Sequence, residues 1–207
     1  MKKILAIVLA LTVVLVCFAA CGNKTATDAN VNTNTDAATT EGANNGEAAP
    51  ADYDAVGLLT SIFATYAEEN SFPIGGGDEA NMNFEGPGKY DVALAEELNV
   101  IAYLPATQND NIAEAANVMN MMNANSFTAA AYLLKDGADA DAFAADFKVA
   151  LDNARWMCGF PEKYVVIKVG SYIITAYGLA DFISYFNAQT ASVYADAVVV
   201  LEGDIVA

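Results

Sequence analysis

The chain has 207 residues, a formal net charge of −17 at pH 7, no histidine and three cysteines. The missing histidine excludes Ser-His-Asp and Cys-His catalysis and every metal site that needs an imidazole ligand. The negative charge disfavours binding to nucleic acid and direct contact of the protein surface with anionic lipid head groups. We therefore expect no nucleic-acid partner, no metal and no cofactor.

The chain begins with a pattern typical of a secretory signal peptide. Lys2 and Lys3 precede residues 4–20, which carry no charged side chain. At 1.5 Å per residue this run covers about 26 Å, less than the roughly 30 Å hydrocarbon core of a membrane. An uncleaved transmembrane anchor is therefore the weaker alternative, and we predict a signal peptide over residues 1–20.

The leader ends in the motif Phe18-Ala19-Ala20-Cys21. This motif resembles the bacterial lipobox, although Phe18 stands where leucine is usual. The resemblance implies a diacylglycerol on Cys21 and a protein held on the extracytoplasmic face of the cell membrane. An ordinary signal peptide cut near Ala20 is the alternative.

Residues 21–51 are rich in Asn, Thr, Ala, Gly, Asp and Glu and have almost no large apolar side chain. Such a segment cannot bury enough surface to offset the entropy lost on ordering. We predict a lipidated, disordered acidic linker. With Cys17 removed and Cys21 acylated, Cys158 is the one remaining thiol, so no intramolecular disulfide can form.

Residues 52–207 have the length of a single globular domain. In its first half, apolar spacing predicts helices, while clustered glycines predict a loop. The expected helix 112–123 would place Met119 and Met122 on its apolar side. The expected elements are a helix over 52–70, a loop over 72–88, a short helix over 91–98, a short strand over 100–104 and the helix over 112–123.

The second half of the domain has clearer periodicity. Its expected elements are strand 126–135, helix 138–154, strands 163–169 and 172–177, helix 179–190 and strand 197–201. Gly170-Ser171 supplies a tight turn between the two central strands. The order is that of an α+β, ferredoxin-like split βαβ fold, in which both helices cover one face of a four-stranded antiparallel sheet. The earlier helices would form an N-terminal helical extension.

Two polar motifs are better explained by structure than by ligand binding. Asp136, Asp139 and Asp141 lack the spacing of a calcium loop and lead directly into a helix, so they are expected to cap it. The glycines around Gly75–Asp78 and Gly86–Lys89 do not match a phosphate-binding loop. A flexible connector is the expected role, although its length also makes it a weak candidate for a partner-binding surface.

The segment 156–161 concentrates large apolar side chains between a helix and a strand. In one interpretation Trp156, Met157 and Phe160 close the end of the core. In the other they stay partly exposed and form an interaction patch, because Trp and Met are favoured anchors in interfaces. Without histidine, a catalytic role for Cys158 is disfavoured. Carbohydrate binding by the tyrosines of the last third is also disfavoured, because tyrosine is common in half-buried strands.

The segments Met121–Phe127 and Trp156–Lys163 resemble a group of small uncharacterised lipoproteins of anaerobic Gram-positive, Clostridia-type bacteria. The resemblance implies a location and adds no mechanism.

We therefore expect a membrane-anchored, non-catalytic binding or interaction module of the cell envelope, whose partners are the membrane, through Cys21, and an envelope protein or ligand. A small-ligand-binding or transporter-accessory lipoprotein is the alternative. An enzyme using the acid pairs Glu68-Glu69 or Asp78-Glu79 is the weakest hypothesis, because adjacent acids do not face each other on a helix.

Overall fold

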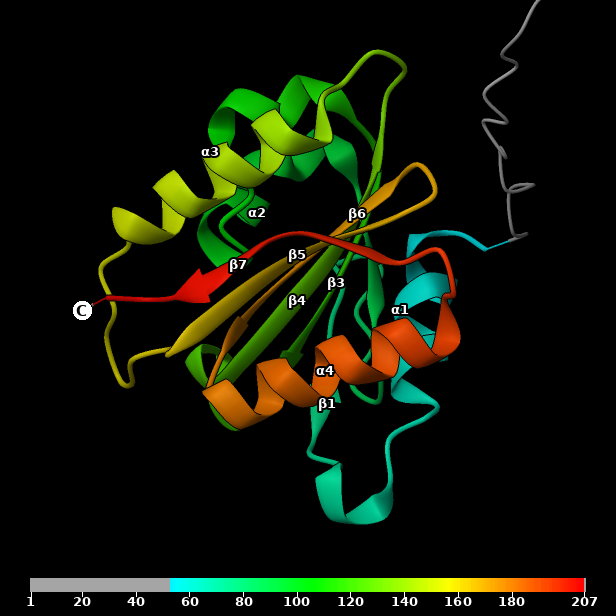
Figure 1. The fold of residues 1–207 in the computed structure, drawn as a ribbon, viewed down its shortest axis with the longest axis vertical. Coiled ribbons are helices and arrows are strands. Elements are labelled where there is room, and N and C mark those ends of the chain that lie inside the picture. The colour runs from blue at the N-terminus through cyan, green and yellow to red at the C-terminus, as the bar shows by residue number, and fades with distance from the viewer. Residues whose placement is uncertain (1–52, 207) are drawn as a thin grey trace, which may run out of the picture. The chain divides into compact units, whose positions relative to one another are not determined.

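The computed structural model describes residues 53–206 (Figure 1). The predicted signal peptide, the lipidation site Cys21 and the predicted linker lie outside these residues. None of the helices within 53–206 has the length and apolar character needed to cross a membrane.

A seven-stranded sheet runs through the described residues, and all its paired strands are antiparallel. The order across the sheet is β1-β3-β4-β6-β5-β7, and β2 also pairs with β3. The strands are β1 (Ile74–Gly75), β2 (Gly88–Tyr90), β3 (Ile112–Asn120), β4 (Phe127–Leu134), β5 (Lys163–Val169), β6 (Tyr172–Gly178) and β7 (Val198–Asp204).

Helices cover both faces of the sheet (Figure 1). Helices α1 and α4 pack on one face, and α2 and α3 lie on the other. The α-helices are α1 (Ala55–Phe63), α2 (Ala95–Ile101), α3 (Ala140–Asp152) and α4 (Ala180–Val193), and short 3-10 turns occupy Glu68–Asn70, Val92–Leu94, Ala106–Asn111 and Ala124–Ser126.

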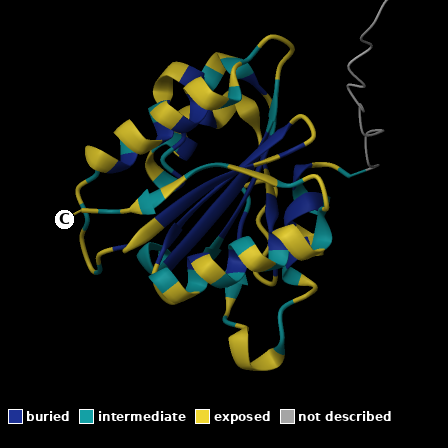
Figure 2. Ribbon diagram, in the orientation of Figure 1, coloured by how far each residue is buried: buried dark blue, intermediate teal, exposed yellow. Residues whose placement is uncertain are grey.

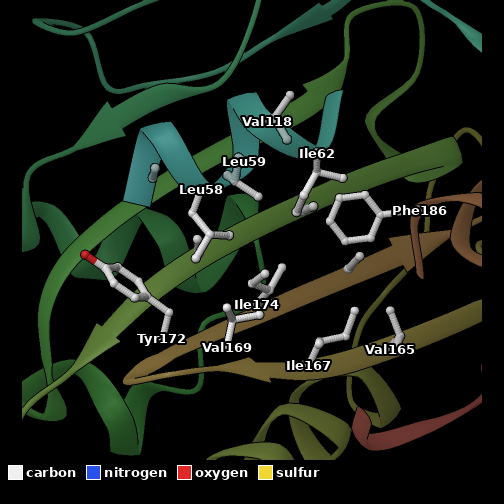
Figure 3. Packing of buried hydrophobic residues seen from close by; sticks show 14 of the residues in the cluster. Leu58, Leu59, Ile62, Val118, Val165, Ile167, Val169, Tyr172, Ile174 and Phe186 are labelled. Carbon is white, nitrogen blue, oxygen red and sulfur yellow. The ribbon is translucent and has the colours of Figure 1, made fainter. Parts of the chain in front are cut away.

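Burial on both faces explains the near-continuous apolar sequence of the central strands. All seven residues of β6 are buried, and Figure 2 shows the middle of the sheet buried beneath helices with exposed outer sides. On the α1/α4 face, Ile174 belongs to a core with Leu58 and Phe186 (Figure 3). On the other face, Ile173 belongs to a core with Phe143.

The predicted order strand-helix-strand-strand-helix-strand is confirmed by β4, α3, β5, β6, α4 and β7. The placement of both helices on one face of a four-stranded sheet is wrong, and the ferredoxin-like arrangement is not confirmed. Strand β7 pairs with β5, so the crossovers β4-α3-β5 and β6-α4-β7 advance in the same direction across the sheet. Because β4 and β6 are antiparallel, two right-handed crossovers in one direction place their helices on opposite faces.

The first half of the domain departs most from the expected elements. The predicted helix 112–123 is strand β3, and residues 100–104 form the end of α2 and a turn in place of a strand. Strand β3 pairs with β4 on one side and with β1 and β2 on the other. These neighbours outweigh the weak helical preference of an alanine-rich segment. The expected helical extension is confirmed in part, because α1 lies within the predicted range 52–70 and α2 overlaps the predicted range 91–98, whereas the third predicted helix is a strand of the sheet.

Candidate functional site

Segments 121–127 and 156–163 meet at one end of the sheet. The turn between β3 and β4 contains Asn123 and Asn125, whose side-chain amides bind the loop that leads into β5. Asn123 Nδ2 donates to the Cys158 carbonyl at 3.0 Å, and Asn125 Nδ2 donates to the carbonyls of Met157 at 2.7 Å and Gly159 at 3.1 Å. Residues far apart in sequence thus form one surface.

The β3–β4 turn is itself fixed by local hydrogen bonds. Asn123 Oδ1 accepts from the Asn125 backbone N–H at 3.0 Å, and Ser126 Oγ donates to the Asn123 carbonyl at 2.6 Å. Thr128 Oγ1 donates to the Ala124 carbonyl at 2.9 Å. Side-chain bonds of this kind stabilise turns against alternative conformations, so the turn presents its two amides in a defined position.

The loop bound by these amides has a strained backbone. Cys158 has a φ of 62° and Gly159 a φ of 139°. A left-handed conformation costs a non-glycine residue roughly 1–2 kcal/mol. The asparagine amides help to hold the loop in this shape, because they are satisfied by three consecutive carbonyls.

Trp156 anchors the same loop to the core. Its ring centroid lies 4.9 Å from that of Tyr103 and 5.5 Å from that of Tyr177, and these two tyrosines are 5.3 Å apart. Tyr177 Oη donates to the Ile101 carbonyl at 3.1 Å, which ties the cluster to the end of α2. Trp156 is therefore half-buried against the α2/α3 core and is not a freely exposed contact residue.

Four apolar side chains on these two segments are exposed to solvent. Met122 is 80% exposed, Met157 78%, Phe160 62% and Met121 47%. We name these four residues the methionine patch. Of the residues singled out from sequence, Met157 and Phe160 belong to it and Trp156 supports it. Sequence reasoning missed Met121 and Met122, because a helix over 112–123 would have turned Met122 into the core.

The glycine loop, residues 76–88, contrasts with the expected flexible connector. Gly76 exchanges backbone hydrogen bonds with Asn83, and the Gly77 N–H donates to Asn117 Oδ1 at 2.7 Å. A Cβ on Gly76 would overlap the Asn117 carbonyl oxygen, so the loop packs directly on β3. The flexible-connector interpretation is therefore wrong.

Asp78 is buried in the centre of the glycine loop. Its carboxylate accepts from the backbone N–H groups of Ala80, Asn81 and Asp91 at 2.7–2.9 Å, and from the Asn81 side chain. Burial alone would raise the pKa of Asp78, but the hydrogen bonds from Asp91, Asn81 and Ala80 outweigh it and hold the pKa below its ordinary value. A carboxylate with its lone pairs occupied in this way organises a loop and is not positioned as a general base.

Other candidate motifs are explained by packing or capping. Asp139 Oδ1 accepts from the backbone N–H groups of Asp141 and Ala142 at 2.9 and 3.3 Å, so it caps α3 as expected. Among the described residues, no group of three or more His, Cys, Asp or Glu side chains could hold a metal ion. Tyr164, Tyr172 and Tyr177 are buried in the two cores and form no exposed stacking platform.

A polar groove of about 390 Å³ lies between α4 and the end of the sheet that begins β5 and ends β7. Ser184 and Asn187 of α4 line one side, and Glu202 and Asp204 of β7 line the other. Lys163 Nζ lies 3.6 Å from Asp204 Oδ1, an exposed pair that contributes little stability.

Comparisons with protein-family models, curated proteins and solved structures found no match. What this domain can do must therefore follow from the surfaces just described.

Proposed function

We propose that this protein is a membrane-anchored extracytoplasmic lipoprotein whose domain binds a protein of the cell envelope without catalysis, through the methionine patch. One observation carries the binding proposal. Four apolar side chains are exposed together on two loops that three asparagine hydrogen bonds join.

Large apolar side chains exposed on two joined loops favour an interaction site, because soluble proteins otherwise keep exposed apolar surfaces small. Methionine suits this role, since its flexible thioether chain adapts to the shape of a partner. Phe160 adds an aromatic anchor of the type found at the centre of interfaces. The backbone beneath these side chains is held in place, so binding would cost little ordering of the loop.

The lipid on Cys21 supplies the membrane part of the proposal. Its support is the motif Phe18-Ala19-Ala20-Cys21 at the end of an apolar leader. A flexible linker of about 30 residues spans on the order of 30 Å. The domain would thus bind its partner close to the outer surface of the membrane.

The test of binding is photo-crosslinking in intact cells from a photoreactive residue placed at position 157, combined with the double variant Met122→Ser and Phe160→Ser. The matched control is Val149→Ser, since Val149 is similarly exposed but lies on α3. We expect one crosslinked protein partner with the unmodified patch and with the control, and its loss in the double variant. The same partner captured by the double variant would contradict a role for the patch.

The anchor has a separate test. Labelled palmitate should be incorporated into the unmodified chain and should be absent from Cys21→Ala. Lipid retained by Cys21→Ala would overturn the assignment of the anchor and leave the binding surface unaffected.

A further inference from the structure

Strand β7 forms a free edge of the sheet. It pairs with β5 on one side, and within residues 53–206 no strand pairs with its other side. The opposite edge differs, because β1 and β2 are two and three residues long and continue into the packed glycine loop. With seven residues, β7 is the longer open template for an added strand.

The direction of its backbone groups follows from one hydrogen bond. The Ile205 N–H donates to the Glu162 carbonyl at 2.8 Å, so the backbone N–H and C=O groups of Ile205 point toward β5. Successive residues of an antiparallel strand alternate in direction. The N–H and C=O groups of Glu202 and Asp204 therefore point toward the open edge.

The side chains of the same two residues face the α4 groove. Glu202 pairs with Val165, which belongs to the core on the α1/α4 face, and Asp204 pairs with Lys163. Both acids line the groove with Ser184 and Asn187 of α4. Outward backbone groups and groove-facing carboxylates thus occur on the same residues.

We propose that β7 binds an extended, basic segment of a partner protein as an additional antiparallel or parallel strand, with a lysine or arginine of that segment beside Glu202 in the α4 groove. Adding a strand to an open edge supplies main-chain hydrogen bonds, and the flanking pocket supplies specificity. Lys163 lies beside Asp204, while Glu202 has no ion pair within the described residues. Glu202 is therefore the carboxylate available to the incoming cation.

The negative charge of the β7 edge favours a basic partner segment over a second copy of this chain. Two copies joined through β7 would bring two sets of Glu202 and Asp204 to one seam, and each chain carries a net charge of −17. Like charges facing each other across paired strands are destabilising. Acidic side chains on an edge oppose self-association and still accept a basic strand. The proposal uses residues outside the methionine patch and does not depend on it.

The test uses the full chain in detergent and an acetylated, amidated peptide of alternating lysine and valine. We expect the peptide to bind and to slow hydrogen exchange at the amides of Glu202 and Asp204. A peptide of alternating glutamate and valine should bind at least about tenfold more weakly. Equal binding of the two peptides, or no slowing of exchange in β7, would overturn the proposal.

Two variants of Glu202 test separately how its charge and its backbone N–H contribute to peptide binding. Glu202→Lys should weaken binding of the lysine peptide about tenfold, while Glu96→Lys, an exposed acid on α2, should leave it unchanged. Glu202→Pro removes the outward N–H and should weaken binding with β5–β7 pairing retained, because proline is tolerated on the free side of an edge strand. An N-methylated lysine peptide makes the same test without altering the protein. Unchanged binding by that peptide would contradict strand addition.

Discussion

The glycine loop and the loop over 154–162 are both held by asparagine side chains of β3 or of the turn that follows it. Asn117 binds the first through the Gly77 N–H, and Asn123 and Asn125 bind the second through carbonyls. The two loops use this support in opposite ways. The first turns its functional group, the Asp78 carboxylate, inward, whereas the second leaves Met157 and Phe160 in solvent.

The glycine loop therefore contributes mainly to folding, whereas the exposed side chains of the 154–162 loop do not. In the glycine loop, buried hydrogen bonds and close backbone packing contribute to the fold, so changes there should unfold the protein. In the 154–162 loop, the side-chain amides of Asn123 and Asn125 and the ring of Trp156 maintain the shape, and the exposed side chains are free to bind. Changes to those side chains should alter binding and leave folding nearly unchanged.

The largest effect is expected from Gly76→Ala. The new Cβ would overlap the Asn117 carbonyl oxygen and lie 2.9 Å from the Gly88 nitrogen, both backbone atoms that cannot move alone. We expect a loss of about 4 kcal/mol or more in the free energy of unfolding, measured by urea denaturation. Gly137→Ala is the control, because Gly137 has a φ of 83° but open space around it. That change should cost only about 1 kcal/mol, and an equal loss in both variants would contradict the packing argument.

Asp78→Asn should have the second largest effect. It replaces a carboxylate that accepts several N–H groups by an amide that accepts fewer, at a cost of about 3 kcal/mol at pH 7. The neighbouring exposed Glu79→Gln is the control and should change the free energy of unfolding by less than about 0.5 kcal/mol.

The same carboxylate predicts a pH dependence. The folded pKa of Asp78 lies below its ordinary value of 3.8, so the unfolded state binds more protons in that range. Its contribution is fully present above about pH 5 and is lost as the pH falls below about 4 through the folded pKa. Hydrogen bonds from Thr107 and Gln108 also lower the pKa of Asp146, which adds to the same trend. Asp78→Asn should flatten, without abolishing, the loss of stability between about pH 5 and 3; an unchanged slope would contradict this account.

Substitutions of Trp156 and Phe160 should differ in their effect on folding, and both effects should be smaller than those of Gly76→Ala and Asp78→Asn. Trp156→Ala removes a half-buried ring that contacts Tyr103 and Tyr177 and should cost about 2 kcal/mol. Phe160→Ala should change the free energy of unfolding by less than about 0.5 kcal/mol but should reduce crosslinking to the envelope partner. Thermal denaturation and crosslinking measured on both variants test the division, and a large destabilisation by Phe160→Ala would show that the patch is part of the core.

Much of the fold follows from local pattern in the second half of the chain. The short apolar runs at 163–169 and 172–177, joined by a tight turn, and the apolar spacing of Phe143, Phe147 and Phe186 predict β5, β6, α3 and α4 within a few residues. The side of the sheet that β7 joins is not encoded by such patterns, because Val198–Leu201 could pair at either edge. That single choice decides whether the two helices share a face.

The candidate site was predictable only in part. Large apolar residues in segment 156–161 indicated a surface between a helix and a strand, but their burial depends on Tyr103, which lies some fifty residues earlier and contacts Trp156. The exposure of Met121 and Met122 was not predicted, because the alanine-rich sequence before them has helical spacing. That sequence forms strand β3, which pairs with β2 on one side and β4 on the other. Contacts between distant segments decide both outcomes.

A small gain in stability is expected from Cys158→Asn. Cys158 adopts a φ of 62°, a region that costs most side chains roughly 1–2 kcal/mol and that asparagine tolerates better. Because Cys158 is exposed and its carbonyl, not its side chain, binds Asn123, the substitution should keep the loop intact. We expect a gain of about 0.5 kcal/mol, whereas Cys158→Val should lose stability because a β-branched side chain fits this conformation poorly. Urea denaturation of both variants measures the difference, and equal stability of the two would show that the strain at Cys158 is relieved in solution.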